Sequence, residues 1–325
     1  MADAKIFTPG MGEVAAIQGP FVAAPFGHAL ADLADRRPEV VGLSADMAKY
    51  TDLLPFAERH PDRYFNVGMA EQNLVAVAAG LAKVGKIPFI TTYGVFLTRR
   101  ALDFIVIACA HSNADVKIFS SMPGLVNGLG GTHQSTEDIA IMRTVPGLTI
   151  IDPADATELE QVVHACADIP GTVYVRNIRG NVPVLLDKAK HRFECNRPTL
   201  LRDGNTVGVI ATGTWSGRAL GVVDQAQARG VSPAILHVAT LKPFAADAVA
   251  EFAARFDRLV IAENHIAHGG LGSQVIETLY RRAIVKPIVH IALENQFHEC
   301  GPQDYLEEHY RFDRGRLLEA IVDGI

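Results

Sequence analysis

The sequence has no cysteine pair of the kind that marks a metal or redox site. Its four cysteines stand far apart, and none belongs to a Cys-x-x-Cys motif. The sequence therefore predicts neither a zinc site nor a redox motif. We expect four buried thiols in a reducing cytoplasm. The four are Cys109, Cys166, Cys195 and Cys300.

Long runs of basic or apolar residues are also missing. No Lys/Arg-rich run is present and the net charge is −6, so nothing argues for binding to nucleic acid or to an anionic membrane. The longest strongly apolar run, Phe104 to Ala110, is far shorter than the ~20 residues that cross a bilayer. The first five residues, Met-Ala-Asp-Ala-Lys, do not begin a signal peptide. We expect a cytoplasmic protein that binds neither nucleic acid nor membrane.

The sequence has the size and pattern of two α/β domains. A chain of 325 residues suggests two domains at roughly 100–200 residues each. Short apolar runs alternate with amphipathic segments, a pattern typical of parallel sheets covered by helices. A stretch of weak periodicity interrupts this pattern. We therefore expect a first domain at 1–188, a linker at 189–200 and a smaller second domain at 201–325.

The alternation locates individual elements. The segments expected as strands are 40–43, 88–92, 116–120, 148–151, 171–175, 207–211, 234–238 and 259–262. The segments expected as helices are 72–84, 97–110, 157–167, 216–229, 245–256 and 272–282. The first helix, for example, carries Leu74, Val75 and Ala78 on one face.

Polar residues that follow the expected strands are candidates for chemistry, because ligands of open α/β sheets lie beyond the carboxyl ends of the strands. Asp46, Glu71 and His133 are in such places. Each also has an ordinary structural interpretation. Glu71 has the position of a first-turn helix acid, and a loop histidine is usually solvated or locally bonded. In the same way Phe96 is by itself a core aromatic, and Arg179 by itself ends a strand in solvent.

Taken together, these segments resemble the pyrimidine-binding and C-terminal domains of the transketolase family, which includes deoxyxylulose-phosphate synthase. The resemblance covers nearly the whole chain and depends on several motifs in a fixed order. The matching segments are Ser44 to Asp46, Phe65 to Asn73, Tyr93 to Arg99, Gly131 to Gln134, Arg176 to Asn181, Glu263 to His265 and Gly269 to Ser273.

The resemblance implies a thiamine diphosphate enzyme, with Glu71 as the glutamate that bonds N1′ of the aminopyrimidine. A carboxyl is needed there because it can share a proton with the ring nitrogen, and dry surroundings that raise its pKa make it a better proton partner. The resemblance makes Phe96 the aromatic that stacks on the pyrimidine. It places Tyr93 and Arg99 on the same approach, and Asp46 near the cofactor.

The resemblance assigns the substrate end to His133 and Arg179. His133 is similar to the family histidine that bonds substrate oxygens as charge develops. Arg179 matches an arginine that reaches the anionic end of the acceptor, and Arg176 is the alternative for that role.

The chain departs from the family where phosphate and donor hydroxyls bind. It has Leu129 where the family has the aspartate of Asp-Gly-x-Thr-His. The chain has Phe21-Val22-Ala23 where the family often has an arginine, and Lys49-Tyr50 where transketolases have a phosphate-contacting serine. It has Ser120-Ser121-Met122 in place of a histidine or arginine. We therefore expect an atypical substrate that lacks a phosphate at one end.

The cofactor's diphosphate has no binding motif here. The family uses Gly-Asp-Gly followed by Asn to hold a divalent ion, and no Gly-Asp-Gly occurs in this chain. Mg²⁺ needs hard oxygen ligands and commonly bridges phosphate oxygens. The resemblance then implies a partner, an N-terminal transketolase subunit that holds the diphosphate and Mg²⁺. We expect this partner to be encoded by the adjacent gene and to form a heterotetramer with this chain.

Two features of the second half suggest other sites. The run Gly269-Gly270-Leu271-Gly272 does not match the dinucleotide fingerprint Gly-x-Gly-x-x-Gly. His265 and His268 lack a third metal ligand and are expected to be polar loop residues. We expect the second domain to support assembly and to shape the substrate channel.

Three functions are compatible with these residues. The preferred one is a subunit of a split transketolase that moves a two-carbon ketol unit from a ketose donor to an aldehyde acceptor. The first alternative is the beta subunit of a 2-oxo acid dehydrogenase's decarboxylating component. The second is a non-catalytic regulatory or binding homologue, because fold alone does not establish chemistry.

Overall fold

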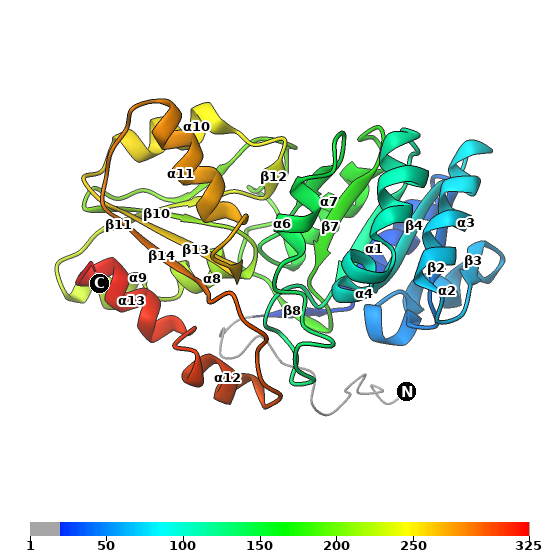
Figure 1. The fold of residues 1–325 in the computed structure, drawn as a ribbon, viewed down its shortest axis with the longest axis horizontal. Helices are drawn as coiled ribbons and strands as arrows, with labels where there is room; N and C mark the ends of the chain where they lie inside the picture. The colour runs from blue at the N-terminus through cyan, green and yellow to red at the C-terminus, as the bar shows by residue number, and fades with distance from the viewer. Residues whose placement is uncertain (1–19, 325) are drawn as a thin grey trace.

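Two α/β units lie side by side in the computed structural model, which describes residues 20–324 (Figure 1). The expected domain limits include residues 1–19 and 325, which lie outside the described residues. The linker was expected at 189–200; segment 184–198 contains no helix or strand, and β9 (Thr199–Arg202) begins within the last two residues of the expected linker. Within residues 20–324, no helix is both long and apolar enough to cross a membrane.

The first unit is built on a seven-stranded sheet. Neighbouring strands are parallel except at one edge, where β12 pairs antiparallel with β6. The spatial order is β12 (Thr240–Lys242), β6 (Thr149–Ile151), β7 (Val173–Asn177), β5 (Lys117–Ser121), β4 (Ile87–Tyr93), β2 (Val40–Ser44) and β3 (Tyr64–Asn66). Strand β12 comes from the second half of the chain, so the two units share a sheet edge.

Helices cover both faces of this sheet. One face carries α3 (Glu71–Lys83), α4 (Gly94–Arg100), α5 (Leu102–Phe104), the π-helical segment η3 (Ile105–His111) and α6 (Asp138–Arg143). The other face carries α1 (Pro25–Ala34) and α7 (Ala156–Cys166). The shorter elements of this unit are η1 (Ala48–Thr51), α2 (Leu54–Arg59), η2 (Pro61–Arg63) and the antiparallel pair β1 (Phe21–Ala23) and β8 (Asn181–Pro183). The predicted apolar face of α3 is buried through Leu74, Val75 and Ala78.

The second unit has a five-stranded sheet. Its order is β14 (Ile288–Leu293), β13 (Leu259–Ile266), β10 (Val207–Ala211), β11 (Pro233–His237) and β9 (Thr199–Arg202), and β9 alone is antiparallel. Figure 1 shows α10 (Ala246–Ala254) and α11 (Leu271–Arg281) on one face. The other face carries α8 (Thr214–Leu220), α9 (Val223–Ala228) and α13 (Arg314–Val322), and α12 (Gln303–His309) precedes α13. Two α/β units with mainly parallel sheets confirm the predicted fold class.

Two predicted helices are interrupted. The segment predicted at 97–110 divides into α4, α5 and η3, because Ala101 leaves the helical conformation with φ −105° and ψ 7°. The segment predicted at 216–229 divides into α8 and α9 at Gly221 and Val222. Apolar periodicity reports which face is buried, and it is less sensitive to a single residue that breaks the backbone geometry.

Candidate active site

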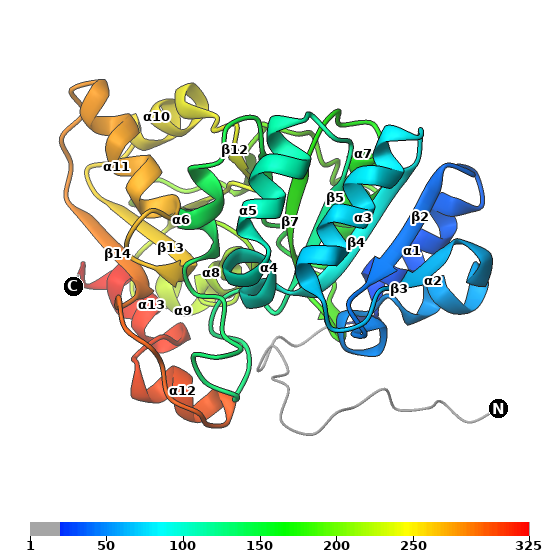
Figure 2. The same ribbon diagram turned by 45° about the vertical axis from the view of Figure 1, so that its right-hand side comes forward.

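Glu71 begins α3 immediately after the turn that follows β3. Its side chain is only 6% exposed, and Arg100 on α4 donates to Glu71 Oε1 from Nη1 at 2.9 Å. Figure 2 brings α3, α4 and α5 into view side by side. The ordinary interpretation of Glu71 as a first-turn acid is therefore incomplete, because a long-range partner holds its carboxylate.

Three of the predicted site residues form one aromatic cluster. The ring centroid of Phe96 lies 5.8 Å from that of Tyr93 and 5.3 Å from that of His133. The His133 ring meets both aromatic rings edge-on. Burial raises the pKa of the Tyr93 hydroxyl. Burial and the nearby Arg100 cation lower the pKa of His133, so its imidazole is neutral at pH 7.

The loop that carries His133 is held by the second unit. Gly130 has φ +74°, and a Cβ at this position would lie 2.6 Å from Cys300 Sγ. The backbone N–H of Gly301 donates to the carbonyl of Gly128 at 3.1 Å. Thr132 Oγ1 lies 2.8 Å from His133 Nδ1 and orients the ring. The second unit thus helps to position the loop that carries His133.

The other three predicted site residues are Arg99, Asp46 and Arg179, and each bonds or contacts groups outside the Tyr93, Phe96 and His133 rings. Arg99 donates to Glu137 Oε1 from Nε at 2.6 Å and to the carbonyl of Gly131 at 2.7 Å, so it supports the loop that carries His133. Asp46 is exposed and accepts from Asn66 Nδ2 at 2.8 Å.

Arg179 lies at the other end of the cluster, where its Nη1 is 4.0 Å from Met122 Sδ and its Nε is 4.0 Å from Asp52 Oδ1.

Arg100 is a site residue that the sequence analysis missed. Its guanidinium carbon lies 4.1 Å from the centroid of the Phe96 ring while its Nη1 bonds Glu71. A signal was present, because residues four apart on a helix share a face, and Arg100 follows Phe96 at that spacing. The family segment ends at the adjacent Arg99, so the site role was predicted for Arg99 instead.

The contacts of the Arg100 guanidinium indicate whether an aminopyrimidine ring fits beside Phe96 and Glu71. It is a flat group with N–H donors, it stacks on Phe96, and it bonds the Glu71 carboxylate. These are the two interactions that the resemblance assigns to the cofactor ring, so Phe96 and Glu71 fit such a ring if Arg100 moves. Within residues 20–324, no three His, Cys, Asp or Glu side chains group as a metal site.

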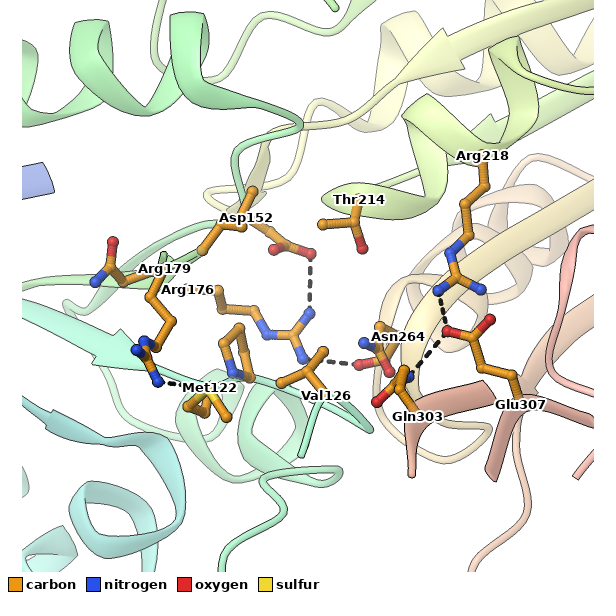
Figure 3. Close-up of a pocket in the computed structure, with 13 residues that line it drawn as sticks. Met122, Val126, Asp152, Arg176, Arg179, Thr214, Arg218, Asn264, Gln303 and Glu307 are labelled. Carbon is orange, nitrogen blue, oxygen red and sulfur yellow. Dashed lines mark hydrogen bonds and ion pairs between the residues drawn. The ribbon is translucent and has the colours of Figure 1, made fainter. Parts of the chain in front are cut away.

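A pocket adjoins this cluster at the seam between the units (Figure 3). Met122 and Val126 line it and also pack with Tyr93 and Phe96. The other residues that line it are Pro123, Asp152, Arg176, Asn177, Ile178, Arg179, Thr214, Arg218, Asn264, Gln303 and Glu307.

Arg176 is buried in a network that joins the two units. It donates to Asp138 Oδ2 at 2.9 Å, to Asp152 Oδ2 at 3.0 Å and to the Asn264 carbonyl at 2.7 Å. Burial alone would lower the pKa of Arg176, but the two carboxylates raise it overall. Its donors are bonded to these partners, whereas Arg179 contacts Met122, which packs with Tyr93 and Phe96.

The glycine run of the second unit has a structural purpose. Glu263 is buried and accepts from the backbone N–H of Leu271 and Gly272, and from His290 Nε2 at 2.9 Å. A Cβ at Gly270 would lie 2.0 Å from Glu263 Oε2. His265 is buried, and its Nε2 accepts from the Ala140 N–H at 3.2 Å.

The cysteines differ from the prediction. Cys109 and Cys166 are buried, but Cys195 and Cys300 are exposed, so the expectation of four buried thiols is wrong for two. Both exposed cysteines lie in segments without helix or strand, where apolar periodicity gives no guide to burial.

Comparison with known families gives matches to both units. Residues 21–184 match the transketolase pyrimidine-binding domain, and residues 198–317 match the transketolase C-terminal domain. The chain belongs to the transketolase family. An uncharacterized transketolase family protein of Sinorhizobium fredii is 46% identical over 97% of this chain and 92% of its own length.

Two further relatives of this transketolase family chain are split proteins. A 6-deoxy-6-sulfo-D-fructose transketolase subunit of a Clostridium species is 35% identical, over 90% of each chain. The solved structure of a split-gene transketolase, an inactive beta4 tetramer, is 36% identical. It superposes with a TM-score of 0.85 over 93% of this chain and 97% of its own.

Proposed function

We propose that this chain is the pyrimidine-binding subunit of a split transketolase that moves a two-carbon ketol unit from a ketose to an aldehyde. The observation that carries the proposal is the single group formed by the buried Glu71 carboxylate, the Phe96 ring and the His133 ring. Its relatives among transketolase subunits support a sugar or aldehyde as substrate.

Each residue has a definite task in this proposal. Bound thiamine diphosphate supplies a carbon nucleophile and an electron sink, which no side chain offers. Phe96 supports the pyrimidine face, and Glu71 holds a proton at N1′. His133 is neutral at pH 7, so it can donate a hydrogen bond to a substrate oxygen or accept one from a substrate hydroxyl. Arg179 faces the far end of the substrate, and the Tyr93 ring packs against Phe96.

A partner subunit completes the proposed enzyme. Met69, in the turn that leads to Glu71, is 80% exposed, and Phe65 on β3 is 40% exposed. Large apolar side chains beside a buried carboxylate suit a surface that another protein covers. We propose that the N-terminal subunit docks there, holds the diphosphate and Mg²⁺, and forms a heterotetramer with this chain. The solved relative is inactive as a beta4 tetramer, which agrees with a need for that subunit.

A Glu71→Gln variant tests the role of the carboxylate. The amide keeps the shape of the side chain but exchanges a proton poorly, so kcat for ketol transfer should fall by about a hundredfold or more. Ketol transfer is measured with the chain assembled with the N-terminal subunit, and circular dichroism checks folding. Glu58→Gln, an exposed change on α2, serves as the matched control. Full activity of Glu71→Gln would contradict the mechanism.

The same assembled complex separates the alternative functions. Release of CO₂ from a 2-oxo acid without ketol transfer would indicate the dehydrogenase beta subunit. A folded complex that takes up no thiamine diphosphate in a calorimetric titration would indicate a non-catalytic homologue. The cytoplasmic location expected from the sequence stays a prediction.

A further inference from the structure

The pocket at the seam between the units has carboxylates for each of its arginines. Figure 3 shows Arg176 bonded to Asp152 and Arg218 bonded to Glu307. Arg176 also donates to Asp138. Arg179 also lines the pocket, so three arginines stand against these three carboxylates of the described residues and this network has no net positive charge. A phosphate dianion here would find no excess positive charge to offset its own.

Of the arginines that line the pocket, Arg179 contacts Met122, which packs with the aromatic cluster, and it too has an acid beside it. Its Nε lies 4.0 Å from Asp52 Oδ1, and Asp52 is buried. Asp52 Oδ2 accepts from the backbone N–H of Gly180 at 2.6 Å, so the acid is fixed beneath the arginine. This carboxylate reduces the net positive charge that Arg179 presents to a ligand.

Two residues that line the pocket have buried amide oxygens that accept no hydrogen bond from the described residues. Asn177 is fully buried, and its Nδ2 donates to Ser121 Oγ at 3.0 Å. Gln303 Nε2 donates to the Leu125 carbonyl at 2.8 Å and to Glu307 at 2.9 Å. Within residues 20–324, neither Asn177 Oδ1 nor Gln303 Oε1 has a hydrogen-bond donor. Buried acceptors of this kind gain from a ligand hydroxyl and are repelled by phosphate oxygens.

The wall between the pocket and the cluster is apolar. Met122 and Val126 line the pocket, and Met47 and Tyr50 pack against the same group. Thioether and aromatic surfaces accept the C–H faces of a sugar chain, but they offer a phosphate few hydrogen bonds.

From these observations we propose that the substrate's far end, lodged between Arg179, Asn177 and Gln303, carries hydroxyl groups and no phosphate. This inference rests on the proposed transketolase function and names the substrate class for the same site. The enzyme then uses unphosphorylated polyhydroxy aldehydes as acceptors.

The test compares two acceptors that differ only in the phosphate. The chain is assembled with its N-terminal subunit and thiamine diphosphate, and kcat/KM is measured for glyceraldehyde and for glyceraldehyde 3-phosphate with one donor. We expect at least a tenfold preference for glyceraldehyde. An equal or greater kcat/KM for the phosphorylated aldehyde overturns the inference, although the proposed ketol transfer would stand.

An Asp52→Asn variant tests the charge argument. It removes the negative charge beside Arg179 and keeps an oxygen for the Gly180 N–H. The ratio of kcat/KM for the phosphorylated to the unphosphorylated aldehyde should rise several-fold. Asp62→Asn, an exposed change on η2, should leave the ratio unchanged. An unchanged ratio in folded Asp52→Asn overturns the inference.

A binding measurement decides the inference if neither aldehyde reacts. In that case the proposed function fails, and the pocket is probed by calorimetric titration of the complex with glycerol and with glycerol 3-phosphate. Preferential binding of glycerol supports a hydroxyl site. Preferential binding of glycerol 3-phosphate, or binding of neither compound, overturns it.

Discussion

At the scale of single residues, the site depends on one guanidinium in two roles. Arg100 satisfies the Glu71 carboxylate and covers the Phe96 ring, and it also lowers the pKa of His133. Its side chain is 52% exposed, so it can leave this position without disturbing the core. A buried carboxylate needs a partner, and Arg100 supplies one.

An Arg100→Ala variant measures how much this contact competes with the cofactor. If the guanidinium occupies the pyrimidine's place, its removal should lower the Kd for thiamine diphosphate several-fold in the assembled complex. Isothermal titration calorimetry gives the Kd, and Arg59→Ala on the exposed face of α2 is the control. Weaker binding by Arg100→Ala would instead make Arg100 a ligand of the cofactor.

At the scale of elements, the start of α11 shows why a glycine run is present. The Glu263 carboxylate binds two backbone N–H groups of the first turn, where the helix dipole favours a negative charge. Burial alone would raise the pKa of Glu263, but His290, the nearby His265 and the Gly272 N–H lower it. Gly270 leaves room for the carboxylate, so the run serves helix α11 and not a nucleotide.

A Gly270→Ala variant tests this packing. The added methyl group would overlap Glu263 Oε2, so the free energy of unfolding of the full chain should fall by about 1–3 kcal/mol. Urea denaturation followed by circular dichroism measures the change. Gly80→Ala is the matched control, since a Cβ there meets no atom within 4 Å and alanine favours the helix. Equal stability of the two variants would contradict the assignment.

At the scale of the whole molecule, a buried polar network joins the two units. Glu158 of the first unit bonds His237 Nε2 of the second at 2.8 Å and His191 Nε2 at 3.1 Å. His237 Nδ1 in turn lies 2.6 Å from Ser216 Oγ. Burial alone would raise the pKa of Glu158, but His237 and His191 hold it at about 2. The order Ser216, His237, Glu158 resembles a hydrolytic triad, but all three side chains are buried and serve the interface.

The low pKa of Glu158 predicts a dependence of stability on pH. The pKa of Glu158 is lower in the folded chain than its ordinary 4.5, so its stabilisation is present above pH 4.5 and is lost as the pH falls toward 2. Glu158→Gln should cost about 3–5 kcal/mol at pH 7 and much less at pH 3, because breaking a buried pair leaves its partner uncompensated. Denaturant unfolding of the full chain at both pH values measures this.

The exposed change Glu251→Gln is the control and should alter stability little at either pH. An equal loss at pH 7 and pH 3 for Glu158→Gln would show that the carboxylate's charge does not stabilise the interface.

The sequence by itself determined the fold class, the family and the order of most strands and helices. Alternating apolar runs are local, so β10 appears at the predicted residues and α3 begins one residue before its prediction. The motifs also brought Glu71, Phe96 and His133 into consideration, because motif residues can be read along the chain. Elements with weak patterns, such as β14, α12 and α13, were not predicted.

Only the tertiary structure decided which side chains meet. It placed Arg100 between Glu71 and Phe96, turned Arg99 toward Glu137, and joined β12 to the sheet of the first unit. It also set Asp52 beside Arg179. These contacts join residues that are often far apart in sequence, and a side chain's direction depends on packing around it. A local sequence pattern contains neither the long-range contacts nor the direction of a side chain. The balance of charges at the site could therefore be established only from the folded chain.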